Sequence, residues 1–133
     1  MLENYRSFVL DDDAKTAFSE LRTRLANAPI LIYPDFSVPY FLDFDASDKG
    51  IGAVLSQIGK DQHEHPIGYF TRTLGKHERN YLITRKELLA AIEGIEHFRC
   101  YLYGRQFVLR TDHVAIYWLK HFKKLTGQLA RWL

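Results

Sequence analysis

The sequence predicts an α/β domain built on a mixed sheet, in which three antiparallel strands and a long helix are followed by a fourth strand parallel to an earlier one. The first observation is a run of three strand-like segments between residues 40 and 74, joined by short links that are typical of an antiparallel meander. The second is a helical pattern of apolar residues from Lys76 to Arg99. The third is another strand-like segment after that helix, because a strand, helix, strand order favours a right-handed parallel crossover.

An amphipathic helix is predicted before these elements, over residues 11–28. Three aspartates precede its apolar positions and suit a helix N-terminus, and Pro29 ends it. An extended connector broken by Pro34 and Pro39 follows. We therefore expect residues 1–39 to be an appendage and residues 40–133 to form the main domain.

The strands can be placed from their alternation and from the turns between them. Residues 40–45 place Phe41, Asp43 and Asp45 on one face of the first strand, with the apolar residues between them on the other. A turn leads to a second strand over 50–57, a polar loop or strand edge over 58–65, and a third strand over 66–74.

The second half of the sequence predicts the crossover and a further helix. The long helix is expected to break or restart near Thr84, and Gly104 ends that region. Residues 106–112 form the expected fourth strand, and residues 114–122 a second, shorter helix.

Composition and charge narrow the class of protein. The chain has 133 residues, 47% of them hydrophobic and 26% charged, which fits one folded domain with an appendage. It has neither an apolar run long enough for a membrane span nor the layout of a signal peptide, so we expect a soluble, intracellular protein. Residues 76–133 hold eleven basic and five acidic side chains, a balance that favours a polyanionic partner.

Three acidic residues fall at positions where they should converge. Asp45 ends the first strand, Asp112 ends the fourth, and Glu87 lies on the helix face shared with apolar residues. If the two strands are parallel neighbours, Asp45 and Asp112 lie side by side at their carboxyl ends, where open α/β sheets commonly bind ligands. The helix then supplies Glu87 as a third carboxylate.

Clustered carboxylates without basic partners repel one another unless a cation lies between them. Oxygen ligands suit Mg²⁺ or Mn²⁺, and two such ions about 4 Å apart can activate a water and stabilise the leaving oxygen of a phosphodiester. The pattern therefore predicts a nuclease that uses Asp45, Glu87 and Asp112 as catalytic residues and metal ligands.

Each of the three has a simpler reading. Asp45 can open the Asp-Ala-Ser-Asp turn, Glu87 can close a capping box that begins at Thr84, and Asp112 can cap the following helix. Taken singly, these readings are the better ones. The joint placement of all three favours the metal site.

Several motifs then resemble a known family, in its order and spacing. They are LDFDASDKGIGAVLSQ, HPIGYFTRTL, RKELLAAIEGIEHFRCYLYGRQFVLRTDH and GQLARWL. Together they resemble the ribonuclease H domain of Ty3/gypsy-type retrotransposon polyproteins over about residues 40–133. Residues 17–36 resemble the segment that joins reverse transcriptase to ribonuclease H, so 1–39 is expected to be the end of the reverse transcriptase or connection segment.

This resemblance implies a ribonuclease H-like fold and endonucleolytic hydrolysis of RNA in RNA–DNA hybrids by a two-metal mechanism. The family's catalytic aspartates match Asp45 and Asp112, and its glutamate matches Glu87. The implied cofactors are two Mg²⁺ or Mn²⁺ ions and no small-molecule cofactor. The implied partners are the hybrid and a reverse transcriptase domain in the same polyprotein, without a membrane.

The sequence departs from the family pattern at its end. The family continues beyond ARWL into a fifth strand and a helix with a fourth carboxylate, whereas this chain stops at Leu133. We expect the fragment by itself to be weak or inactive as a nuclease. The alternative is a catalytically inactive, domesticated or truncated module that binds nucleic acid or protein.

Basic residues near the three carboxylates are candidates for contacts with substrate phosphates. They are Lys49, Arg79, Arg85 and Lys86, and ordinary surface charge is an equally good explanation for any single one. His63 and His65 alternate like a metal pair, but a polar loop that enters a strand explains them better than zinc does.

Overall fold

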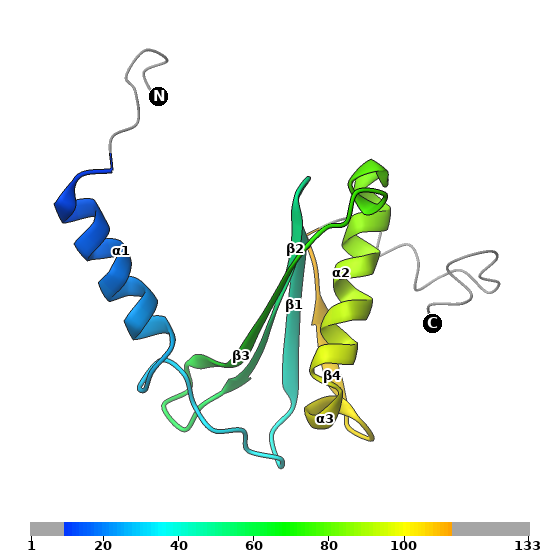
Figure 1. Ribbon diagram of the computed structural model, residues 1–133. Helices are drawn as coiled ribbons and strands as arrows, with labels where there is room; N and C mark the ends of the chain where they lie inside the picture. Colours follow the sequence, from blue (N-terminus) through cyan, green and yellow to red (C-terminus); the bar gives the residue numbers. More distant parts are fainter. Residues whose placement is uncertain (1–9, 113–133) are drawn as a thin grey trace. The chain divides into compact units, whose positions relative to one another are not determined.

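The computed structural model describes residues 10–112, which divide into two compact units between Ile32 and Tyr33. The first unit holds the predicted amphipathic helix, α1 (Asp12–Leu25) (Figure 1). The Asp11 side chain caps it by accepting a hydrogen bond from the backbone N–H of Ala14 at 2.8 Å. The helix predicted over 114–122 and the ARWL segment lie outside the described residues.

The second unit begins with the connector. The side-chain amide of Gln57, a buried residue, donates hydrogen bonds to the carbonyls of Asp35 and Val38 at 2.8 and 2.7 Å and accepts one from the Asp35 N–H. Arg105 donates to the carbonyl of Phe36 at 2.9 Å. The connector is therefore tied to the sheet. The assignment of residues 1–39 to a reverse transcriptase segment stays a prediction.

The sheet confirms the predicted topology. Its strands are β1 (Tyr40–Ala46), β2 (Gly50–Ile58), β3 (Glu64–Thr73) and β4 (Phe107–Arg110), in the spatial order β3-β2-β1-β4. β1, β2 and β3 are antiparallel neighbours, and β4 runs parallel to β1. β3 begins two residues earlier than predicted, and its pairing with β2 changes register between Leu55 and Ser56, where β3 has the extra residue Ile67.

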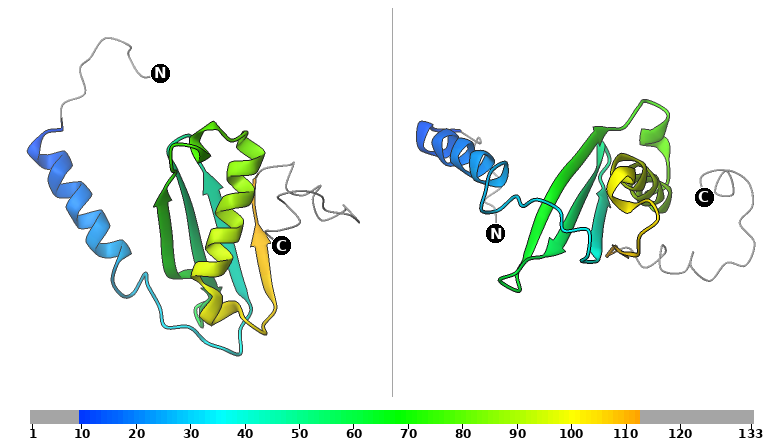
Figure 2. Two further views of the ribbon diagram at one scale, coloured as in Figure 1. Left: turned by 45° about the vertical axis from the view of Figure 1, so that its right-hand side comes forward. Right: turned by 90° about the horizontal axis from the view of Figure 1, so that it is seen from below.

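The crossover from β3 to β4 is helical, as the periodicity predicts. A short 3₁₀ turn, η1 (Glu78–Asn80), precedes α2 (Ile83–His97) and the four-residue α3 (Arg99–Leu102), so the expected break near Thr84 is present. Both α-helices lie on one face of the sheet (Figure 2). The described part of the second unit is thus a helix layer on a mixed sheet, which confirms the predicted fold class.

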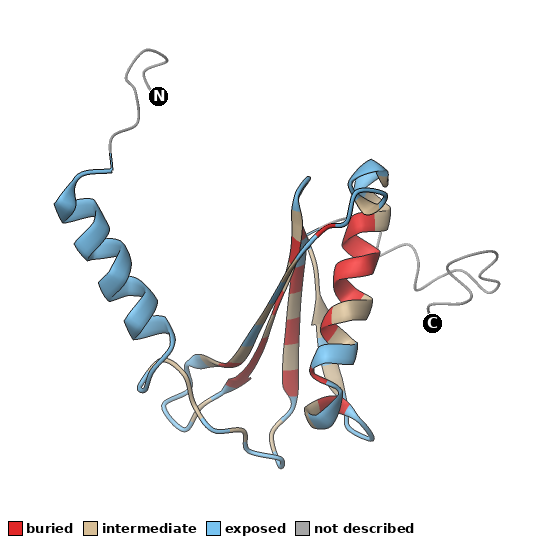
Figure 3. Cartoon of the chain, viewed as in Figure 1, coloured by how far each residue is buried: buried red, intermediate tan, exposed pale blue. Residues whose placement is uncertain are grey.

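The core lies between α2 and the covered face of the sheet, where buried residues alternate along β1 (Figure 3). Leu42 and Leu55 face one another across β1 and β2 and are fully buried. Gly94 lets α2 approach closely, because a Cβ atom added there would lie 2.9 Å from the Cβ of Ala53. Burying these apolar side chains is the main stabilising contribution to the unit.

The opposite, open face of the sheet carries the other half of the alternation. Within the described part of this unit no helix covers it. Tyr69 is 44% exposed and Val108 47% exposed. Asp43 and Asp45 of β1 belong to the same face, by alternation with the buried Leu42 and Phe44. The predicted catalytic strand therefore presents its carboxylates away from the core.

Candidate active site

Asp45 and Asp112 meet at the carboxyl ends of two neighbouring parallel strands. β4 pairs with β1 up to Arg110, which lies opposite Asp43, and each aspartate follows its member of that pair by two residues. Both line one pocket of about 250 Å³. The rest of its lining is Asp43, Phe44, Arg110 and Thr111. The parallel crossover thus brings together two carboxylates that are 67 positions apart in the sequence.

Glu87 reaches the same region from the helix layer. It lies in the first half of α2 and is only 3% exposed. Its Oε1 accepts a hydrogen bond at 3.2 Å from the backbone N–H of Ala46, the residue after Asp45. The capping-box reading is wrong, because α2 begins at Ile83 and its cap residue, Leu82, offers no side-chain hydrogen bond. Glu87 is directed at the end of β1 instead.

Asp45 and Asp112 share a pocket and Glu87 accepts a hydrogen bond from the backbone next to Asp45, but the three carboxylates do not form a ready ligand set. Within residues 10–112 no three His, Cys, Asp or Glu side chains are arranged so as to hold a metal ion. Their donor chemistry suits Mg²⁺ or Mn²⁺, which prefer oxygen ligands. That Asp45, Glu87 and Asp112 together coordinate two metal ions stays a prediction. His65 pairs with Asp61 at 2.9 Å, which fits the polar-loop reading of that segment.

The turn after Asp45 is held from two sides. The hydroxyl of Ser47 accepts a hydrogen bond from the Gly50 N–H at 3.0 Å, and the Ser47 N–H donates to the Gly50 carbonyl. Lys86 of α2 donates to Asp48 at 2.9 Å, and the pKa of Asp48 is lowered because of this hydrogen bond and the lysine charge. The Lys86 side chain is only 5% exposed. This arrangement argues against Lys86 as a phosphate contact.

Of the other basic candidates, two are exposed and Arg85 is partly buried. Lys49 is exposed in the β1–β2 turn, and Arg79 is exposed while its Nε donates to the carbonyl of Leu74 at 3.0 Å. The guanidinium carbon of Arg85 lies 3.8 Å from the ring centroid of Tyr81, a cation–π contact. Their predicted phosphate contacts stay predictions.

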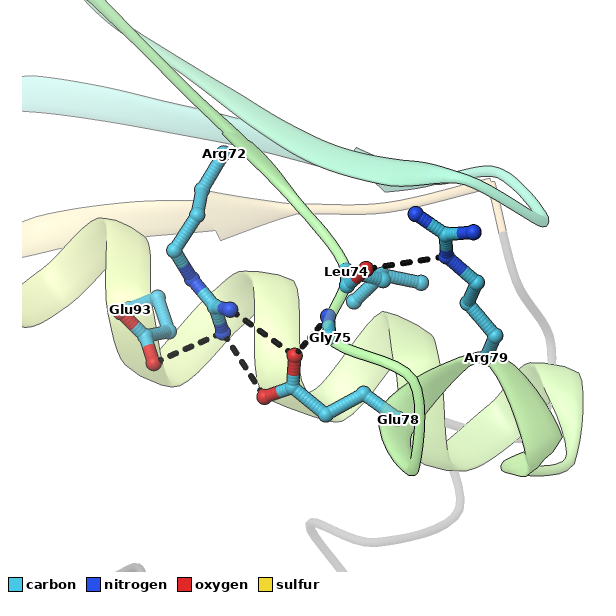
Figure 4. Close-up of polar contacts among 6 residues, drawn as sticks. All are labelled: Arg72, Leu74, Gly75, Glu78, Arg79 and Glu93. Atoms are coloured by element: carbon cyan, nitrogen blue, oxygen red, sulfur yellow. Dashed lines mark hydrogen bonds and ion pairs between the residues drawn. The ribbon is translucent and has the colours of Figure 1, made fainter.

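Two arginine networks were not predicted from the sequence. The first lies on the covered face, where Arg72 donates to both oxygens of Glu78 at 2.9 and 3.1 Å and to Glu93 of α2 at 3.0 Å (Figure 4). Glu78 also accepts a hydrogen bond from the Gly75 N–H at 2.7 Å. The hydrogen bonds that Arg72 donates to Glu78 lower the pKa of the Glu78 carboxyl and raise the pKa of Arg72. This network ties β3 and η1 to α2.

The second network lies on the open face. Arg110 donates to Asp43 through Nε at 2.7 Å and to Glu64 through Nη1 at 2.9 Å, and its Nη2 contacts both carboxylates. Ser56 also donates to Glu64, at 2.6 Å. The hydrogen bonds to Asp43, followed by those to Glu64, raise the pKa of Arg110. The four residues belong to four different strands, so only the sheet register brings them together.

Comparisons with known proteins agree with this fold and topology. The model of the family described as "RNase H-like domain found in reverse transcriptase" matches residues 10–109. The Pol polyprotein of transposon 297 from Drosophila melanogaster is 44% identical over 116 residues, which cover 87% of this chain and 10% of that protein. The gypsy Pol polyprotein of the same fly is 36% identical, over 92% of this chain and 12% of its own length. The chain therefore spans about a tenth of these relatives.

Solved structures show the same fold at low sequence identity. A foamy viral protease-reverse transcriptase dRH in complex with double-stranded DNA aligns over 98% of this chain and 24% of its own, with a TM-score of 0.72 and 16% identity. The foamy viral protease-reverse transcriptase in complex with an RNA/DNA hybrid aligns over 92% of this chain and 17% of its own, with a TM-score of 0.56 and 17% identity.

None of the helices in residues 10–112 is long and apolar enough to cross a bilayer. The sheet order, the helical crossover and the family match extend over the same part of the sequence. The chain belongs to the family of RNase H-like domains found in reverse transcriptases, in the form carried by retrotransposon polyproteins.

Proposed function

We propose that this domain, in its parent protein, hydrolyses the RNA strand of RNA–DNA hybrids. The observation that carries the proposal is the pocket shared by Asp45 and Asp112, with Glu87 hydrogen-bonded to the backbone directly after Asp45. Carboxylates at the ends of neighbouring parallel strands are where an α/β sheet presents groups to a ligand. The expected products end in a 3′-hydroxyl and a 5′-phosphate.

Asp45, Glu87 and Asp112 are the residues that would hold two Mg²⁺ or Mn²⁺ ions. When bound, such ions supply a nucleophilic hydroxide at neutral pH and stabilise the charge on the leaving oxygen. Asp45 and Asp112 offer their carboxylates from the pocket. Glu87 is buried in α2, and its hydrogen bond from the Ala46 N–H ties α2 to the end of β1. No small-molecule cofactor is part of this proposal.

The proposed substrate and partners rest on the comparisons. The relatives are Pol polyproteins, and a protein of similar fold was solved in complex with an RNA/DNA hybrid. We infer that the hybrid is the substrate, that a reverse transcriptase domain belongs to the same polyprotein, and that the protein acts inside the cell. Lys49, Arg79 and Arg85 are the proposed phosphate contacts, since they carry positive charge on the elements around Glu87 and the turn after Asp45.

The test is cleavage of a labelled RNA–DNA hybrid by the parent protein in Mg²⁺ or Mn²⁺. We expect Asp45→Asn to lower the cleavage rate at least a hundredfold, because the change removes a ligand charge while keeping the size of the side chain. Asp61→Asn is the matched control, since it alters an exposed carboxylate in the β2–β3 loop. Equal rates for wild type and Asp45→Asn, or no cleavage by the parent with either metal, would overturn the proposal.

A second candidate is a module that binds nucleic acid or protein without cutting. It is favoured by one observation: the described residues contain no ready three-ligand metal group. Tight binding of the hybrid that Asp45→Asn leaves unchanged, together with no cleavage in any divalent metal, would establish this candidate instead. Cleavage that depends on Asp45 excludes it.

A further inference from the structure

The position of Asp112 depends on a short strand. β4 has four residues, and among the described strands it pairs only with β1. Asp112 lies two residues beyond Arg110, the last paired residue of β4. A four-residue parallel pairing gives few hydrogen bonds, so side chains must help to hold the end of β4 in register beside β1.

Arg110 supplies such a hold. Its Cα partner across the strand pair is Asp43, and its guanidinium binds both oxygens of the Asp43 carboxylate. A bidentate pair between a guanidinium and a carboxylate fixes the relative orientation of the two side chains as well as their distance. Asp45 and Asp112 each follow this pair by two residues, and both line the pocket that the pair also lines.

The same guanidinium also reaches across the sheet. It binds Glu64 of β3 through two nitrogens, and Ser56 of β2 donates to the same carboxylate. The guanidinium carbon also lies 4.8 Å from the ring centroid of Phe41. These contacts leave Arg110 few alternative orientations. β4 is therefore fastened to the three-stranded meander on the open face, beside the pocket that holds Asp45 and Asp112.

We propose that Arg110 is a positioning residue: by bridging Asp43 and Glu64 it holds the end of β4 in register, and so places Asp112 opposite Asp45. This inference rests on the proposed function for its consequence in metal binding and cleavage. Its structural half, the hold on β4, can be tested without that function. Lys cannot replace Arg here, because an ammonium group lacks the fork that binds two carboxylates at once.

The chain offers a matched control in Arg72. This arginine also bridges two carboxylates and is 32% exposed, against 37% for Arg110, but its network lies on the covered face and does not line the Asp45 pocket. Loss of Arg72 should weaken the fold without changing how Asp112 faces Asp45.

Electrostatics and positioning predict opposite changes in Mn²⁺ affinity when Arg110 is replaced. Removing a positive charge from a carboxylate pocket by itself strengthens Mn²⁺ binding, whereas the loss of positioning weakens it. We expect Mn²⁺ affinity, measured by calorimetry where circular dichroism shows each variant folded, to fall about tenfold in Arg110→Met and in Arg110→Lys, the size typical when groups that orient metal ligands are lost. Arg72→Met should stay within twofold of wild type.

Reversing the pair provides the rescue. Arg110→Asp combined with Asp43→Arg keeps the cross-strand pair and the net charge of the pocket, so Mn²⁺ affinity should return to within about threefold of wild type. Tighter binding by Arg110→Met, or equal losses in Arg110→Met and Arg72→Met, would overturn the positioning role.

Amide hydrogen exchange separates this inference from the proposed function. We expect the β4 amides from Val108 to Arg110 to exchange at least tenfold faster in Arg110→Met, with the β2 amides unchanged. If wild type binds no Mn²⁺, the proposed function fails, and faster β4 exchange still supports the hold on β4. Unchanged β4 exchange refutes that hold whatever the metal result.

Discussion

The two faces of the sheet are formed by alternate residues of the same strands, and they differ in role. The covered face packs against α2, whereas the open face carries the candidate site. On the covered face, Leu42 and Leu55 are fully buried under α2, and Arg72 ties β3 to that helix. On the open face, the partly buried Asp43 and the exposed Asp45 line the pocket. Arg110 there ties β4 to β1 and β3. Along β1, alternate residues therefore contribute to the stability of the core and to the candidate site.

The largest expected difference between the faces is in apolar side chains. Leu42→Ala should lower the free energy of unfolding by about 2–5 kcal/mol, because it empties a fully buried site. Val54→Ala on the open face should cost less than about 1.5 kcal/mol, since Val54 is only partly buried. Chemical denaturation of both variants measures the two values. Equal losses would mean that the open face is covered as thoroughly as the core.

The two arginine networks should differ in activity more than in stability. Arg72→Met and Arg110→Met should each lower the free energy of unfolding by about 1 kcal/mol, because both break charge-assisted hydrogen bonds that are partly exposed. In the parent protein only Arg110→Met should also slow hybrid cleavage in the folded state, by about tenfold. Thermal unfolding and steady-state cleavage at a temperature well below the transition measure these effects. A similar loss of rate in Arg72→Met would remove the distinction between the faces.

Acid should weaken both networks. Arg72 lowers the pKa of Glu78, and Arg110 lowers the pKa of Glu64, from an ordinary value of 4.5. A carboxyl group with a lowered pKa in the folded state stabilises the fold fully above its unfolded value, and that stabilisation disappears as the pH falls through its folded value. The free energy of unfolding should therefore decline below about pH 5. Denaturation between pH 7 and pH 3 should show a shallower decline in Arg72→Met and Arg110→Met than in wild type.

The smallest expected effect is at Val108 of β4, the outermost strand next to β1 among the described residues. Val108 is 47% exposed on β4, so Val108→Thr should change the free energy of unfolding by no more than about 0.5 kcal/mol. Thr keeps the β-branched shape that suits a strand. A loss above 1 kcal/mol by chemical denaturation would show that something covers this part of the open face.

The elements of the fold were predictable because their periodicities are local. Alternation along β1 assigned Asp43 and Asp45 to the face away from the core, and the helical pattern placed Glu87 among buried residues. The strand, helix, strand order predicted only that β4 would lie parallel to an earlier strand, and the structure identifies that strand as β1. These features are set by short stretches of sequence, or by a rule that holds for nearly all sheets.

The contacts between distant side chains were not predictable in the same way. Lys86 was expected on the surface, as lysines usually are, yet its ammonium group lies buried against Asp48. The Arg110 network needs the registers of three strand pairs at once, and one of them contains a bulge. Its only signal in the sequence was a charged residue on the open-face side of both β1 and β4.

The close packing of α2 on β2 at Gly94 also affects the position of Glu87 on the same helix. α2 packs against β2 at Gly94, where an added methyl group would collide with Ala53, and Glu87 lies seven residues, or about two turns, nearer the start of the helix. A side chain at position 94 would push this end of α2 away from the sheet and tilt the helix. The carboxylate of Glu87 would then tilt away from the Ala46 amide, although nothing near it had been altered.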